Sequence, residues 1–389
     1  MSVRFSQVPR GARRWPMCLT LQWRFREALL AIVALAAIGP ARLAAAEDVM
    51  ADAQASVAAA SARVTTWDGP INGPAAVPGK TIVYVASDMR NGGIAGTLGG
   101  IQEAAAAIGW QVRMIDAKGT DAGIKAALDE AIAGKPDAIV VGGFDAQLMA
   151  DQLKRAADSG IKIVAWHGAS QPGPITAAGV IVNVATDSAL VAKVAADYAI
   201  VKSGGTAGVV VFTDSGFSIA LSKARAMARR IKECGGCQLL ALEDVAISQT
   251  PEKMPGETAS LLQRFGDRWT YTLAINDLYF DNMGPTLNGA GKAAGTGPFN
   301  ISGGDGSTSA FDRIRSHGFQ IATVAEPLVL QGWQIVDELN RAFSGAPTSH
   351  YVTPVHLVTP ENIAFDGGPY NWFDPENGYR NIYRRIWGK

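Results

Sequence analysis

Short apolar runs alternate with amphipathic segments along most of the chain, and this alternation predicts its secondary structure. The runs are rich in β-branched residues, as in 81–86 (TIVYVA) and 207–212 (AGVVVF), and they indicate buried strands. The segments between them are typical of helices, and the one over 96–108 ends at Gly109, a residue that commonly terminates helices. Nearly continuous apolar strands separated by helices predict parallel sheets covered by helices on both faces.

The predicted elements fall into two successive blocks. Strands are expected over residues 81–86, 110–115, 138–141, 161–166 and 179–184, and then over 207–212, 239–243, 271–275, a short segment from 301, and 320–324. Helices are expected over residues 47–66, 96–108, 122–133, 147–159, 190–202, 218–233, 258–265, 310–316 and 329–343. The fold class is therefore α/β, with two doubly wound parallel-sheet lobes. Ligands of such sheets bind at the carboxyl ends of the strands, so the loops there should carry the site.

Residues 1–46 have the pattern of a secretory signal peptide. An arginine-rich leader precedes an apolar run of eleven residues, Leu29 to Gly39, and Ala44 to Ala46 then offers a small-residue cleavage site. The alternative is a membrane anchor, but a helix of this length rises about 1.5 Å per residue and falls short of a bilayer core of ~30 Å. We expect cleavage near Ala46 and a periplasmic protein. The pair Arg13 and Arg14 leaves both the general secretory route and twin-arginine export open.

Cleavage at this point changes the charge of the chain. The whole sequence has 35 basic and 35 acidic residues, and residues 1–46 hold seven Arg and one Glu. The remaining 28 basic and 34 acidic residues give a formal net charge of −6. This balance, without a block of basic residues, argues against nucleic acid as a partner.

Two cysteines remain after cleavage, Cys234 and Cys237, in the sequence ECGGC. In an oxidising compartment a local disulfide is the first expectation for such a pair. Free thiols, redox catalysis and a metal site are the alternatives. Redox catalysis expects a thioredoxin-like setting, and zinc expects a second pair of ligands, and the sequence shows neither.

From about Lys80 to about Pro360, the order of elements and of the loops after strands resembles the ribose/galactose-type periplasmic binding proteins of ATP-driven (ABC) sugar uptake systems, which have the type I solute-binding fold. The resemblance rests on several short motifs in the family's order. They are Ser87-Asp88 with Asn91, Thr186-Asp187, Ile275-Asn276-Asp277, Gly303-Gly304-Asp305-Gly306 and Thr323-Val324-Ala325-Glu326.

This resemblance implies two lobes joined by three strands at a hinge. The crossings would fall near 183–185, 325–328 and 353–357. Lobe 1 would comprise residues 80–184 and 327–350, and lobe 2 residues 185–325 and 353–389 with the C-terminal tail. Residues 47–79 would form an N-terminal helix followed by a tether rich in glycine and proline.

The resemblance and the residue chemistry together give a set of candidate ligand contacts between the lobes. Asn91 matches a polar contact of the family's first loop, and His167 stands where sugar binders usually carry Asp. Asn276 and Asp305 match an amide and a carboxylate that hold the ligand from the second lobe, and both can hydrogen-bond hydroxyl groups. Glu326 takes a hinge-side position. Asp88, Trp166, which can stack on a sugar ring, and Phe217, which can close the pocket, complete the set.

Two departures from the family's pattern bear on the ligand. Sugar binders often have aromatic residues just after the first Asn, where this chain has Gly92-Gly93-Ile94. The Arg that many members place after the first strand of the second lobe has no match within 213–222.

The expected function is capture of a small polar solute, a sugar, sugar alcohol or derivative, for delivery to the permease of an ABC transporter. We expect a monomer. We also expect no cofactor, no metal and no catalytic residues, because no hydrolase, zinc or nucleotide-binding motif occurs. The main alternative is a periplasmic sensor that presents the solute to a chemoreceptor or histidine-kinase ectodomain. An enzyme that kept the fold would need a nucleophile, which the candidate residues lack. The effector domain of a cytoplasmic repressor would need DNA-binding helices and no signal peptide.

Overall fold

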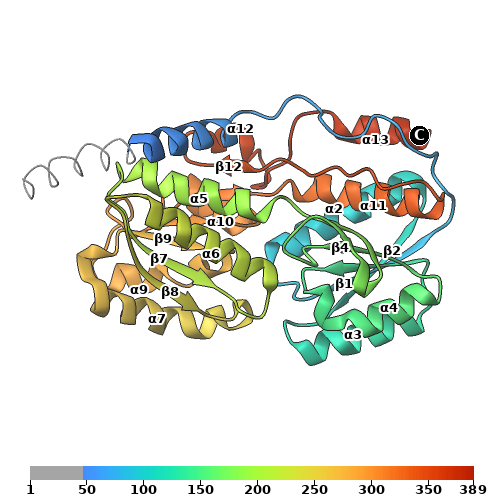
Figure 1. Ribbon diagram of the computed structural model, residues 1–389, viewed down its shortest axis with the longest axis horizontal. Helices are drawn as coiled ribbons and strands as arrows, with labels where there is room; N and C mark the ends of the chain where they lie inside the picture. The colour runs from blue at the N-terminus through green and yellow to red at the C-terminus, as the bar shows by residue number, and fades with distance from the viewer. Residues whose placement is uncertain (1–46) are drawn as a thin grey trace, which may run out of the picture. The chain divides into compact units, whose positions relative to one another are not determined.

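The computed structural model describes residues 47–389, and the predicted signal peptide lies outside the described residues. The described chain contains two six-stranded sheets, each flanked by helices, and they form two lobes (Figure 1). The strand order is β2-β1-β3-β4-β6-β5 in the first sheet and β12-β11-β10-β9-β7-β8 in the second. The predicted α/β class with two doubly wound lobes is confirmed.

The first sheet is parallel except at one edge, where β5 runs antiparallel to β6. Its strands are β1 (Thr81–Ala86), β2 (Gln111–Asp116), β3 (Ala138–Gly142), β4 (Lys162–Trp166), β5 (Gly173–Ile175) and β6 (Val180–Val184). Alternate side chains of β1 enter different cores: Ile82 and Tyr84 face one side of the sheet, while Val83 and Val85 face the other. This two-sided burial explains why the strands are apolar throughout.

Helices cover both faces of the first sheet. They are α2 (Gly92–Ile108), α3 (Asp121–Ala133), η1 (Ala146–Met149), α4 (Ala150–Asp158), η2 (Thr176–Ala178) and, from the end of the chain, α11 (Leu328–Phe343) and α13 (Tyr379–Trp387). Helices α2, α11 and α13 pack on one face, and α3 and α4 pack on the other. The start of α2 is set by Asn91, whose side-chain oxygen accepts a hydrogen bond from the Gly93 amide.

The second sheet is parallel except for its edge strand β12, which pairs antiparallel with β11. Its strands are β7 (Gly208–Thr213), β8 (Gln238–Asp244), β9 (Tyr271–Ala274), β10 (Phe299–Ser302), β11 (Gln320–Ala325) and β12 (His356–Val358). Its helices are α5 (Ser188–Lys202), α6 (Ser218–Glu233), η3 (Ile247–Gln249), α7 (Thr250–Phe265), η4 (Gly266–Arg268), α8 (Leu278–Asp281), α9 (Gly284–Gly289), α10 (Thr308–Arg315) and α12 (Ile363–Asp366).

Helix α7 begins eight residues before the predicted start at 258. The segment TPEKMPGE holds two prolines and a glycine, which together indicate a break in a helix. Pro251 lies in the first turn, where backbone N–H groups have no hydrogen-bond partner within the helix, so its missing N–H costs no bond. The helix also accommodates Pro255 in its interior. Helices α8, α9, α12 and α13 and strands β5 and β12 were not among the predicted elements.

The C-terminal tail differs from its predicted place. Residues 353–389 were assigned to the second lobe, and β12 and α12 do pack there. Helix α13, however, packs on α11 in the core of the first lobe, because it buries Tyr379, Tyr383 and Trp387 against Trp333. The tail therefore spans both lobes.

The N-terminal segment follows a similar course in the opposite direction. Residues 47–60 are helical and bury Ala53 and Ala60 in the core of the second lobe, beside α5 and α6 (Figure 1). The Gly/Pro-rich tether then reaches the first lobe, where Trp67 contacts the rings of Tyr351 and Tyr383. The helix is shorter than the predicted 47–66.

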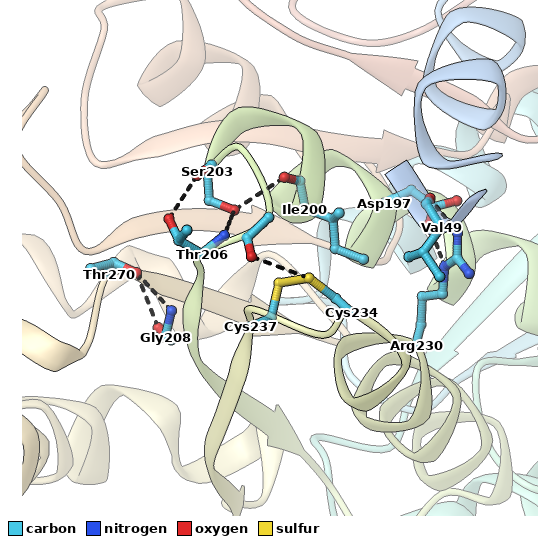
Figure 2. The surroundings of a disulfide bond; sticks show 11 residues. Val49, Asp197, Ile200, Ser203, Thr206, Gly208, Arg230, Cys234, Cys237 and Thr270 are labelled. Carbon is cyan, nitrogen blue, oxygen red and sulfur yellow. Dashed lines mark hydrogen bonds and ion pairs between the residues drawn. A yellow bond between two sulfur atoms is a disulfide. The ribbon is translucent and has the colours of Figure 1, made fainter. Parts of the chain in front are cut away.

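Cys234 and Cys237 form a disulfide between the end of α6 and the start of β8 (Figure 2). The loop is held further by Cys234, whose sulfur contacts the Gly205 carbonyl oxygen at 3.5 Å. On the same helix, Arg230 donates to the buried carboxylate of Asp197 at 2.6 Å and to the carbonyl of Val49. These contacts join the N-terminal helix to α5 and α6.

Candidate functional site

A cavity of about 250 Å³ lies between the lobes at the carboxyl ends of the strands. The residues after β1, β3 and β4 line it from the first lobe, and those after β7, β8 and β9 line it from the second, as the fold predicts. Seven of the eight candidate residues line it: Asp88, Asn91, Trp166, His167, Phe217, Asn276 and Asp305. The eighth, Glu326, lies directly behind His167.

Glu326 is fully buried and joins elements of both lobes. Its Oε1 lies 3.0 Å from Nε2 of His167, which follows β4, and 3.8 Å from Nζ of Lys223 in α6. Its Oε2 accepts a hydrogen bond of 2.7 Å from Gln331 in α11. Burial raises the pKa of this carboxyl, but His167, Lys223 and Gln331 together outweigh that effect and hold the pKa well below its usual range. Glu326 is therefore an anion at neutral pH.

Lys223 was missed by the sequence analysis. It lies in α6, one residue beyond the segment searched for the family's Arg, and its side chain lines the cavity although the residue is only 3% exposed. The signal was present in the sequence, because Lys223 falls on the buried face of α6 with Ala220, Ala224 and Met227. A lysine among apolar positions of a helix needs a partner, and here Glu326 supplies it.

Asn276 and Asp305 form the second lobe's polar contribution. The Asn276 amide donates a hydrogen bond of 2.7 Å to Oδ2 of Asp305, and both residues are buried. Asp305 has a φ of +25°, in the region that favours glycine, and its carbonyl accepts from the Glu326 amide. Such backbone conformations concentrate at functional sites. The Asn276 bond leaves the other oxygen of Asp305 to accept from a ligand.

Trp166 and His167 are stacked, with ring centroids 3.9 Å apart and planes at 9°. The indole N–H donates to Gln331 at 2.7 Å, so Trp166 is fixed within the first lobe. His167 has a φ of +54°. One face of the indole, which the sequence analysis offered to a sugar ring, is therefore taken by the imidazole.

The match to a family model decides which family this chain belongs to. A model of the periplasmic binding protein domain matches residues 82–347, more than half of the chain. The chain belongs to the periplasmic binding protein domain family. No curated protein matches its sequence.

Solved structures of solute-binding and sugar-binding proteins share its fold at low sequence identity. An Agrobacterium vitis ABC transporter solute-binding protein bound with α-D-tagatopyranose has a TM-score of 0.66 and 20% identity, covering 76% of this chain and 99% of that one. A galactofuranose-binding protein has a TM-score of 0.65 and 17% identity, covering 78% and 99%. A second A. vitis solute-binding protein, with bound allitol, has a TM-score of 0.60 and 20% identity, covering 73% and 97%.

The remaining candidates take mainly structural contacts in this periplasmic binding protein. Asp88 is paired with Arg90, with a shortest contact of 2.6 Å, and Asn91 caps α2. Phe217, just before α6, packs against the cores of both lobes and so bridges the cleft. Asp214, which the sequence analysis did not propose, also lines the cavity. Burial raises its pKa, even though it accepts hydrogen bonds from the backbone of Gly216 and Ile247.

His167, Asp305 and Glu326 each offer one ligand atom, and these atoms lie within 4.8 Å of one another. Oε1 of Glu326 also lies 3.8 Å from the ammonium of Lys223. A cation bound by Glu326 would lie close to this second positive charge and be repelled by it, so we assign no metal to the cluster. None of the helices in residues 47–389 is both long enough and apolar enough to span a membrane.

Proposed function

We propose that this chain captures a small, hydroxyl-rich solute, a sugar or a sugar alcohol, in the interlobe cavity and delivers it to the permease of an ABC transporter. The observation that supports this proposal most is the composition of the cavity wall. One lobe contributes His167 and the other contributes Asp305, Asn276 and Lys223, so a bound ligand touches both lobes. Carboxylate acceptors beside amide and ammonium donors suit hydroxyl groups, which both donate and accept.

The size of the cavity and the related structures favour the same ligand class. A volume of about 250 Å³ lies just below the usual range for ligand pockets, roughly 300–1,000 Å³, and so favours a small ligand. The related solute-binding structures hold tagatopyranose and allitol, a cyclic sugar and an open-chain sugar alcohol. Apolar residues complete the wall, among them Phe144 and Phe217, and they would meet the C–H faces of such a ligand.

Closure follows from the division of contacts between the lobes. A ligand that touches Asp305 and His167 at once gains its full binding energy only when the lobes are together, so it shifts the population toward the closed form. The permease would then recognise the closed protein. The family and the predicted signal peptide support a periplasmic location for this cycle.

The proposal is tested by thermal unfolding of the chain from Glu47 in the presence of sugars, sugar alcohols, sugar acids and small nitrogenous solutes. A ligand at 100 times its dissociation constant adds about 2.7 kcal/mol of stability, a rise of several degrees in Tm. We expect one sugar or polyol to give this rise, and Asp305→Ala to abolish it. The matched control is Asp151→Ala, an exposed residue of α4 outside the cavity wall, which should keep the full rise. The proposal is contradicted if no compound raises the Tm, or if the rise persists in Asp305→Ala.

The sensor alternative predicts the same ligand binding but a different effect of deleting the gene. Deleting the gene should abolish uptake of the labelled ligand if the protein serves a transporter. If it serves a receptor, uptake should persist and only the response to the ligand should be lost.

A further inference from the structure

The first turn of α2 meets the loop after β10 directly across the cleft. A Cβ atom placed on Gly93 would lie 2.4 Å from Oδ2 of Asp305 and 2.7 Å from its Cβ. A Cβ atom placed on Gly92 would lie 2.8 Å from Cβ of Ser307. Non-bonded carbon atoms pack at about 3.5–4.0 Å, so neither position accepts a side chain in this arrangement.

The loop on the second lobe has little freedom to retreat. Asp277, which is buried, accepts hydrogen bonds of 3.0 Å from the backbone amides of Gly306 and Ser307, and others from Gln320 and Thr323. Asp305 is held in addition by Asn276 and by the Glu326 amide. The loop is thus fixed to β9 and β11 at several points.

Helix α2 is equally fixed on the first lobe. It packs so closely on α11 that a Cβ on Gly100 would lie 2.5 Å from the Val329 carbonyl oxygen, and one on Gly96 would lie 2.6 Å from Leu328. Because neither side can move within its own lobe, a side chain at position 93 can be accommodated only by separating the lobes.

We infer that Gly92 and Gly93 form the seam on which the two lobes close, and that glycine is required there for closure. The inference rests on the proposed function, since it names the residues that permit the closed, ligand-holding state. It also bears on the ligand: at this end of the cleft the space beside α2 is filled by the protein's own Asp305 and Ser307. Ring contacts must come from the Phe144 and Phe217 end of the cavity.

The test measures the distance between the lobes. Spin labels on Lys125→Cys in α3 and Lys253→Cys in α7, both exposed, report lobe separation in the chain from Glu47, whose own two cysteines are joined. The parent protein should show a population at the distance that the structure gives. Gly93→Ala should lose that population. Gly99→Ala is the matched control, because a Cβ at this position of the same helix meets no atom within 4 Å.

A compensating substitution separates a steric seam from general damage. The three atoms nearest to a Cβ on Gly93 all belong to the Asp305 side chain. Adding Asp305→Gly to Gly93→Ala should therefore restore the closed population, even though the double variant lacks a proposed ligand contact. Both variants should give circular dichroism spectra like the parent's.

The distances are measured first without ligand, so this test does not depend on finding a solute in the thermal screen. Where the thermal screen supplies a ligand, the same distances are recorded at saturation, and Gly93→Ala should stay open. A closed population in Gly93→Ala equal to the parent's, or no rescue by Asp305→Gly, overturns the inference. So does the lack of a closed population in the parent under both conditions.

Discussion

Glu326 shows how a single carboxylate can connect the parts of the site. It touches His167 of the first lobe, Lys223 of the second and Gln331 of α11, and it is only 1% exposed. Removing one partner of a buried ionic group leaves the others uncompensated, which costs far more than the pair contributes in net terms.

We expect Glu326→Gln to lower the free energy of unfolding by roughly 3–5 kcal/mol, because it leaves the buried Lys223 without its anion. Urea denaturation at pH 7 measures this. The control is Glu130→Gln, which breaks the exposed pair with Arg113 and should change the stability by less than about 1 kcal/mol. Equal effects of the two substitutions would show that the Glu326 network has no special energetic role.

The pH dependence of that difference has a definite sign. The folded pKa of Glu326 lies below the unfolded value of about 4.3, so its contribution is fully present above that pH and is lost as the pH falls toward the folded pKa. The stability gap between the parent and Glu326→Gln should therefore narrow as the pH is lowered below about 4. A gap that widens on acidification would contradict the assigned direction.

At this scale most of the residues predicted from the sequence do line the cavity, but the contacts that each one makes were not predictable. Asp305 and Asn276 follow strands of a parallel sheet, and strand ends are visible as changes in polarity. Lys223 lies within a helix, where only its position on the buried face marks it as a residue of the cavity wall. Which part of that face meets the cavity depends on how α6 packs. The stacking of His167 on Trp166 depends on a backbone conformation that no residue pattern specifies.

Among the elements, α13 makes the most extensive unpredicted contact. Trp387 stacks on Trp333 of α11 with centroids 5.4 Å apart, and its indole N–H donates to the buried carboxylate of Asp337 at 2.9 Å. Asp337 also accepts from Arg341, which in turn donates to the carbonyl of Asn72 in the N-terminal tether. The last helix and the tether are therefore parts of one packed layer.

Trp387→Ala should destabilise the protein by about 3–5 kcal/mol, since it removes a fully buried aromatic side chain and leaves Asp337 short of a donor. Trp372→Ala is the control, because Trp372 belongs to the same tail but is 40% exposed, and it should cost about 1 kcal/mol or less. Chemical denaturation of both variants checks the difference. A Trp387 effect as small as that of Trp372 would mean that α13 contributes little to the first lobe.

Long elements with a regular apolar pattern were predictable, and short or mostly polar ones were not. The strand over Thr81–Ala86 and the helix over Ser218–Glu233 have the predicted bounds because apolar runs and helical spacing mark them plainly. Strand β12 has three residues and α12 has four, so both are too short to show the periodicity of apolar residues that marks a strand or a helix. The sequence YRNIYRRIW of α13 looks polar, and its buried face is recognisable only once α11 is in place.

For the whole molecule, the terminal segments add two chain crossings between the lobes to the three that the family resemblance implies. The N-terminal segment crosses between the helix over 47–60 and Trp67, and the tail crosses between α12 and α13. Arg63 and Glu376 pair at 2.5 Å between the two crossings. Under the proposed function, these crossings restrain how far the lobes separate.

Deleting residues 47–66 should broaden the distribution of lobe separations in the ligand-free protein, because it removes one crossing together with the Arg63 pair. The spin labels at positions 125 and 253 report this width. The substitution Arg63→Ala alone, which breaks only an exposed pair, should leave the width nearly unchanged. A deletion variant with the parent's distribution would show that the N-terminal crossing does not restrain the lobes.

The position of α11 and α13 also has a consequence for the order in which the chain can fold. All six strands of the first sheet are complete by Val184, yet one of its faces is covered by α2 together with helices from residues 328–343 and 379–387. A chain emerging from the ribosome therefore exposes part of that apolar face until residues 379–387 have been synthesised. The first lobe therefore cannot complete its packing before the second lobe has been synthesised.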